Sequence, residues 1–121
     1  WVAPEIVERT EPSAVTTAYL DHFAAAESTG DYAVLTAALL PCFWIYADVG
    51  DALATRNRPG HPYADWLATY ADEAFAAATR RAIEITEGAV QRADASSRRA
   101  AARAFRASCV HEKEFFAAPL R

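Results

Sequence analysis

Residues 39–50 read LLPCFWIYADVG, an apolar stretch with a Pro-Cys pair in the middle of what its spacing predicts to be a helix. Proline inside a helix removes a backbone donor and clashes with the preceding turn, which costs roughly 3 kcal/mol unless something compensates. Pro41 is therefore either a tolerated kink between packed helices or a device that directs the next turn toward a cavity. The sequence alone leaves both interpretations open.

The helix around this pair is predicted to begin after Asp31, a side chain that can cap its first turn. Side chains along it recur at spacings of four and three residues, the pattern of one buried helical face: Leu35, Leu39, Cys42, Tyr46 and Val49. Cys42 and Tyr46 are thus expected to point the same way, one turn apart.

Helical signals also dominate the rest of the chain. It has only four Gly, and no stretch alternates apolar and polar residues long enough to predict a strand. We expect an all-α single domain over residues 1–121. Four other helices are expected. The first runs from a cap at Thr10 or Glu11 to about Gly30, and the second from Pro62 to about Tyr70. The third runs from Asp72 to a break at residues 94–96, and the last from there through Phe105 toward Pro119. A loop with a Pro-Gly turn is expected at residues 55–61.

Composition and charge exclude several classes of protein. A net charge of −4, with 12 basic residues scattered among 16 acidic ones, gives no basic stripe for nucleic acid. The apolar run at residues 33–47 is interrupted by Pro41 and is expected to be too short to span a bilayer. We therefore expect a cytoplasmic protein without nucleic-acid or membrane partners. The chain contains no Met and opens on Trp1, which suggests a piece of a longer product.

Two cysteines, Cys42 and Cys109, lie far apart in the sequence and are expected to be free thiols. A lone cysteine on an apolar face is more often a packing residue than a nucleophile. The neighbours of Cys42 favour the second possibility, because Tyr19, Tyr46 and Tyr70 all fall at inward or junction positions. Their hydroxyls need partners, which a polar ligand, buried water or backbone carbonyls could supply.

Glu112 is the sharpest anomaly. On the last helix it shares a face with apolar and small residues: Phe105, Ser108, Cys109, Phe115 and Phe116. A carboxylate on such a face must find a partner or become neutral, and either state suits a general acid/base. The alternative is a structural ion pair with an arginine. No carboxylate–histidine spacing supports a metal site, so we predict no metal.

Three stretches together resemble the TenA family, the thiaminase II or aminopyrimidine aminohydrolases of the heme-oxygenase-like fold. They are AALLPCFWIYADVG at residues 37–50, HPYADWLATYADEAF at 61–75 and HEKEFF at 111–116. The first is the most specific, and the resemblance extends from TTAYL at residues 16–20 onward. It implies a helical bundle and an enzyme that replaces an amine, or the thiazolium of thiamin, by water to release hydroxymethylpyrimidine for thiamin salvage.

The resemblance also implies roles for individual residues. Cys42 would be the nucleophile and Glu112 the acid/base. The pyrimidine pocket would be lined by Tyr19, Tyr46, Tyr70 and Phe115. It implies no metal and no organic cofactor, a small-molecule pyrimidine substrate, and a homotetramer.

Two departures from the family pattern keep other hypotheses open. The end FFAAPLR differs from the family's usual continuation, and the helices expected here match only the C-terminal part of the family's domain, without the Asp that grips the aminopyrimidine. We therefore expect association with the N-terminal part or with another copy. The alternatives are a catalytically inactive pyrimidine-binding or scaffold protein and, more weakly, an oxidase of the same fold that uses a metal or quinone.

Overall fold

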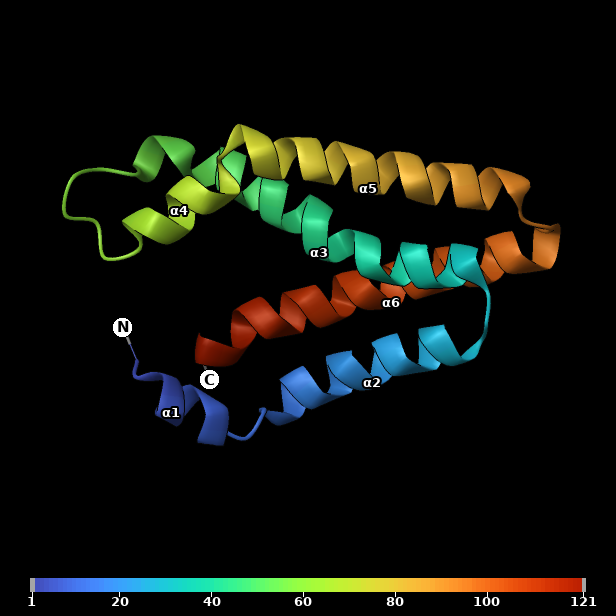
Figure 1. The fold of residues 1–121 in the computed structure, drawn as a ribbon, viewed down its shortest axis with the longest axis horizontal. Helices are drawn as coiled ribbons and strands as arrows, with labels where there is room; N and C mark the ends of the chain where they lie inside the picture. Colours follow the sequence, from blue (N-terminus) through green and yellow to red (C-terminus); the bar gives the residue numbers. More distant parts are fainter. Residues whose placement is uncertain (1, 121) are drawn as a thin grey trace.

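The computed structural model describes residues 2–120, which form helices joined by turns and short loops (Figure 1). The elements are α1 (Pro4–Arg9), α2 (Ala14–Ser28), α3 (Tyr32–Leu53), the 3-10 helix η1 (Ala54–Arg56), α4 (Ala64–Tyr70), α5 (Glu73–Arg92), α6 (Ala95–Ala117) and the 3-10 helix η2 (Ala118–Leu120). The prediction of an all-α fold is confirmed.

Helix α3 is the centre of the bundle, and α2, α5 and α6 pack against it (Figure 1). The loop that follows η1, helix α4 and the C-terminal end of α6 gather at one end of the molecule. The core between the long helices is built largely of alanine, because small side chains allow the helix backbones to approach closely: Ala26, Ala33, Ala37, Ala38, Ala89, Ala101 and Ala104 are all buried.

Two of the four long helices begin at the caps expected from the sequence. Asp31 accepts hydrogen bonds from the backbone N–H groups of Ala33 and Val34, and Asp72 accepts one from Ala74. Asp94, at the predicted break before the last helix, accepts one from Ser97. Each carboxylate satisfies N–H groups that would otherwise lack a partner at a helix start.

The expected start of the first long helix was wrong. Helix α2 begins at Ala14 and is capped by Ser13, whose hydroxyl accepts a hydrogen bond from the Thr16 N–H. Thr10 instead donates its hydroxyl to the Ile6 carbonyl at the end of α1, a short helix that we did not predict. The short helix α4 likewise begins two residues after Pro62.

The expected buried face of α3 was wrong in part. Leu39 is 38% exposed, whereas Val34, Leu40 and Pro41 on other sides of the helix are buried. The reason is the central position of α3, which is covered from several directions rather than along one stripe.

The expectation that this apolar run is too short for a membrane was also wrong. The helix continues through Pro41, and by length and composition Tyr32–Arg56 could cross a bilayer. In the structure, however, α3 packs against α2, α4, α5 and α6, as the core helix of a globular domain does. The absence of a membrane partner stays a prediction.

Candidate active site

Three helices bring a thiol, a phenol and a carboxylate into one hydrogen-bonded chain. Tyr19 of α2 donates its hydroxyl to Glu112 Oε1 of α6 at 2.9 Å. The same hydroxyl lies 3.2 Å from the Sγ atom of Cys42 on α3. Because the Tyr19 proton is directed at the carboxylate, the thiol is the donor to the phenol oxygen. The three side chains therefore form a relay from Cys42 through Tyr19 to Glu112.

Glu112 is the most unusual member of this chain because only 2% of its surface is exposed. The expected alternative, an ion pair with an arginine, is wrong: its partner is the Tyr19 phenol. Its second oxygen, Oε2, is buried and has no hydrogen-bond partner within residues 2–120. A buried carboxylate oxygen without a partner is costly in a folded protein, so this atom is suited to receive a polar group of a ligand.

All six residues singled out in the sequence line one cavity of about 340 Å³. They are Tyr19, Cys42, Tyr46, Tyr70, Glu112 and Phe115, and three further phenylalanines complete the wall: Phe23, Phe43 and Phe75. The lining is aromatic except for the thiol and the carboxylate. Such a cavity suits a flat ring with a few polar atoms on its edge.

Burial raises the pKa values of the thiol and of two phenols that line the cavity. It raises the pKa of the Cys42 thiol to about 11, with a contribution from the charge of Glu112, while the hydrogen bond with Tyr19 acts in the opposite direction. Burial is also the main reason that the pKa of Tyr46 rises to about 12 and that the pKa of Tyr19 is raised. Cys42 is therefore a neutral thiol at pH 7, and it needs a base to become a nucleophile.

Two histidines lie behind Tyr19. The rings of Tyr19 and His111 are stacked at 5.1 Å with an angle of 11° between their planes, and His22 lies 5.2 Å from His111. His22 Nε2 is 2.9 Å from the hydroxyl of buried Ser108, which donates to the Ala38 carbonyl. Both histidines are half-buried. This stack fixes the plane of the Tyr19 ring.

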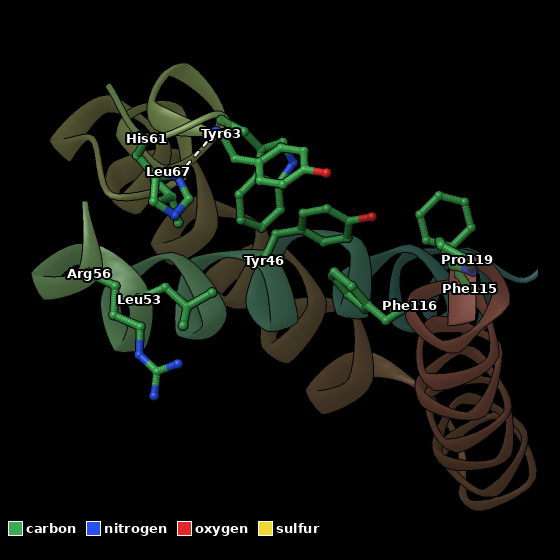
Figure 2. A pocket seen from close by; sticks show the side chains of 10 residues that line it. Tyr46, Leu53, Arg56, His61, Tyr63, Leu67, Phe115, Phe116 and Pro119 are labelled. Atoms are coloured by element: carbon green, nitrogen blue, oxygen red, sulfur yellow. Dashed lines mark hydrogen bonds between the residues drawn. The ribbon is translucent and has the colours of Figure 1, made fainter. Parts of the chain in front are cut away.

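A second, larger cavity of about 530 Å³ lies next to the first, and both share Tyr46 and Phe115 as lining residues. Figure 2 shows the Tyr46 ring between Tyr63 on one side and Phe115 and Phe116 on the other. The second cavity is formed by the end of α3, η1, the following loop, α4 and the end of α6. We did not predict this cavity, because its residues come from segments with no common periodicity.

His61 lies in the loop before α4. Its Nδ1 atom accepts a hydrogen bond from the Tyr63 N–H, one residue before α4 begins (Figure 2). This contact tightens the turn that presents Tyr63 to the second cavity.

Among residues 2–120, no group of three or more His, Cys, Asp or Glu side chains is arranged to hold a metal ion. Cys109, the other thiol, is half-buried on α6 and lines neither of the two aromatic cavities.

Curated proteins similar to this chain come from bacteria. The chain is 49% identical over 105 residues to the "Thiamine biosynthesis multifunctional protein ThiED" of Corynebacterium efficiens, a match that covers 87% of this chain and 14% of that protein. It is 39% identical over 66 residues to the "Aminopyrimidine aminohydrolase" of Bacillus subtilis, covering 54% of this chain and 28% of the relative. The chain is 36% identical over 78 residues to the protein of the same name from Halalkalibacterium halodurans, a match that covers 61% of this chain and 34% of that protein.

The chain thus spans between 14% and 34% of the length of these relatives. The match to a sequence model of a whole family covers more of this chain than any of these matches to single proteins. The sequence model of the TENA/THI-4/PQQC family matches residues 2–121, which include all three helices that carry the relay. The resemblance drawn from the short stretches around Cys42, Tyr70 and Glu112 is therefore confirmed over the whole chain, and the chain belongs to the TENA/THI-4/PQQC family.

Proposed function

We propose that the protein containing this chain is an aminopyrimidine aminohydrolase of the thiaminase II type, which acts in thiamin metabolism. The single observation that carries this proposal is the relay of Cys42, Tyr19 and Glu112 on the wall of an aromatic cavity. The names of the two aminopyrimidine aminohydrolases support this reaction class, and the name of the Corynebacterium protein supports a place in thiamin metabolism.

The relay supplies the base that Cys42 needs. Its Sγ proton passes to the Tyr19 oxygen while Tyr19 passes its own proton to Glu112 Oε1. The result is a thiolate and a neutral carboxylic acid, with Tyr19 unchanged. Because the pKa of the thiol is about 11, the transfer is favourable only when the thiolate adds at once to an electron-poor ring.

The ring of a 4-aminopyrimidine provides that acceptor. The thiolate adds to a ring carbon while Glu112 passes the proton that it received from Tyr19 to a ring nitrogen. The unpartnered Oε2 of Glu112 is available to accept a hydrogen bond from the substrate. The electron pair of the ring then expels the amine from the exocyclic methylene carbon; the aminomethyl group is an ammonium at neutral pH, so it leaves as neutral ammonia. Water adds to that carbon, and loss of the thiolate and of the ring proton restores the aromatic pyrimidine. One water is consumed and one amine is released for each alcohol formed.

The remaining side chains bind and orient the ring. Tyr46, Tyr70 and Phe115 provide flat apolar surfaces on which an aromatic ring can pack, and they exclude water from the thiolate. The Tyr46 and Tyr70 rings contact each other at 5.0 Å, which holds both in place. These steps need no metal or organic cofactor.

Location and assembly are part of the proposal. We propose a cytoplasmic enzyme that works as a homotetramer, with the small pyrimidine as its partner. Leu39, Phe43 and Trp44 are exposed on α3, which supports a surface covered by further protein in the complete molecule.

The test is a stoichiometric assay of the complete gene product. We expect release of one ammonia and one hydroxymethylpyrimidine for each 4-amino-5-aminomethyl-2-methylpyrimidine consumed, measured by coupled ammonia detection and chromatography. Binding of hydroxymethylpyrimidine in calorimetry without any turnover would instead support the inactive pyrimidine-binding protein. Turnover that requires a stoichiometric metal would support the oxidase hypothesis.

A further inference from the structure

The two histidines behind Tyr19 lie outside both aromatic cavities. Tyr19 is the middle member of the relay, so its hydroxyl must stay within hydrogen-bond distance of both Cys42 and Glu112. Neither His22 nor His111 lines the cavity beside Cys42 or the larger cavity next to it. The histidines are therefore placed to act on the reaction through Tyr19 and not through a bound ligand.

The Tyr19 ring contacts three other rings. It is nearly parallel to the His111 ring, at 5.1 Å and 11°, and it contacts Phe23 at 4.4 Å and 39°. The His22 ring is stacked at 6.4 Å and 27°. A phenol that turned about its side-chain bonds would carry its hydroxyl away from one hydrogen-bond partner or the other. A flat ring packed against the phenol opposes that turn.

His22 is itself anchored by a chain of hydrogen bonds. Because Ser108 donates its only proton to the Ala38 carbonyl at 2.6 Å, His22 Nε2 is the donor to the Ser108 hydroxyl at 2.9 Å. Ser108 is completely buried, and Ala38 lies one turn before Cys42 on α3. The anchor thus ties together α2, α6 and α3, the three helices that carry the relay.

The charge of the pair agrees with a stacked arrangement. Burial, and then the positive charge of His111, lower the pKa of His22, whereas the Ala104 carbonyl acts in the opposite direction. His22 is therefore mainly uncharged at pH 7. The two imidazole rings, 5.2 Å apart, then do not carry two like charges that would push them away from each other.

We propose that His22 and His111 are positioning residues that hold the Tyr19 ring in the orientation in which its hydroxyl joins the Cys42 thiol to the Glu112 carboxylate. His111 supplies the flat surface against the phenol, and His22 keeps His111 in place from its anchor on Ser108. The effect on turnover rests on the proposed function, whereas the effect on the relay does not.

The first test compares two apolar replacements of His111 in the complete gene product. Leucine fills the space without a flat ring, and phenylalanine keeps the ring. We expect kcat for the aminomethylpyrimidine to fall at least about 10-fold in His111→Leu, with KM changed less than about twofold, because Tyr19 does not line up for the proton transfer. His111→Phe should recover most of that loss.

His22 provides a second pair of variants that does not alter the ring against Tyr19. His22→Leu removes the donor to Ser108 and should lower kcat in the same way, without a change in KM. His22→Gln should recover activity, because its amide can still donate to the Ser108 hydroxyl. Circular dichroism of each variant checks that the helices are intact.

A readout independent of turnover is the titration of Cys42, followed by its alkylation with iodoacetamide and peptide mass spectrometry. The hydrogen bond from Tyr19 lowers the pKa of the Cys42 thiol. In His111→Leu that bond is weakened, so the alkylation profile should move to higher pH, and in His111→Phe it should return. The control is His61→Leu, which removes the histidine of the loop before α4 and should leave the profile unchanged.

The outcomes separate the positioning role from the proposed function. An unchanged kcat in His111→Leu, a loss that appears only in KM, or a loss that His111→Phe does not recover would overturn the positioning role. If the unaltered protein hydrolyses no aminomethylpyrimidine, the proposed function fails and the alkylation profile alone decides. A shift to higher pH in His111→Leu but not in His111→Phe would then support the positioning role, and identical profiles would overturn it.

Discussion

Replacing Cys42 by Ser in the complete gene product is expected to lower turnover of the aminomethylpyrimidine at least about 1,000-fold. The serine hydroxyl fits the same space and can still donate to Tyr19, so the cavity and its hydrogen bonds should persist. An alcohol is far less acidic than even a thiol of pKa about 11, and the relay to Glu112 cannot deprotonate it. The measurement is ammonia release at saturating substrate.

Glu112→Gln should cause a loss of similar size, because an amide cannot accept the proton that Tyr19 delivers. If both groups act in one step, the Cys42→Ser/Glu112→Gln double variant should be no slower than the slower single variant. Cys109→Ser is the control, since this thiol lines neither cavity, and it should be fully active. Unchanged turnover in either single variant, or losses that multiply in the double variant, would contradict the relay.

A Gly50→Ala substitution is expected to destabilise the fold by roughly 3 kcal/mol. Gly50 lies near the end of α3, where α4 packs against it, and it is buried. An added Cβ would lie 2.6 Å from the Tyr70 carbonyl carbon and 2.9 Å from the Tyr70 Cβ, so α4 must shift. Since Tyr70 lines the cavity, activity should fall together with the melting temperature, by about 10 °C in thermal unfolding.

Gly88→Ala is the matched control for this prediction. It is also a glycine inside a helix, but an added Cβ would meet only the flexible end of Arg92, at 3.3 Å. Alanine is the better helix former by up to about 1 kcal/mol, so this variant should be as stable as the original or more stable. Equal melting temperatures for the two variants would show that α4 does not pack on Gly50 as described.

The helices were predictable because their signals are local. Asp31 and Asp72 are followed directly by helical periodicity, and both act as caps in the structure. The first helix start was mispredicted because Thr10, Glu11 and Ser13 are all possible caps within four residues. Only the end of α1, which uses the Thr10 hydroxyl, decides between them.

The candidate site was predictable for a different reason. A carboxylate on an apolar helix face and tyrosines on inward stripes violate the usual distribution of polar groups, and such violations mark functional residues. The convergence of Tyr19, Cys42 and Glu112 in one cavity could not be derived from the sequence, because it depends on how α2, α3 and α6 cross. The family resemblance provided that expectation.

Features that depend on tertiary packing alone escaped prediction. The stack of His22 and His111 behind Tyr19 joins residues from two helices that lie far apart in the chain. The second cavity combines a helix end, a loop and the last turn of α6. The buried surface of α3 depends on its central place, which its own periodicity does not reveal.

The most direct test of the central claim is the alkylation rate of Cys42 by iodoacetamide as a function of pH, followed by peptide mass spectrometry. The Cys42 thiol is expected to titrate near pH 11 because of its burial and the charge of Glu112. Removing that charge in Glu112→Gln should lower the pKa, so alkylation at pH 8 should become faster even though turnover is lost. Glu114→Gln, a carboxylate of the same helix outside the cavity, should leave the profile unchanged. An ordinary thiol pKa of about 8.5 that is insensitive to Glu112→Gln would contradict the account.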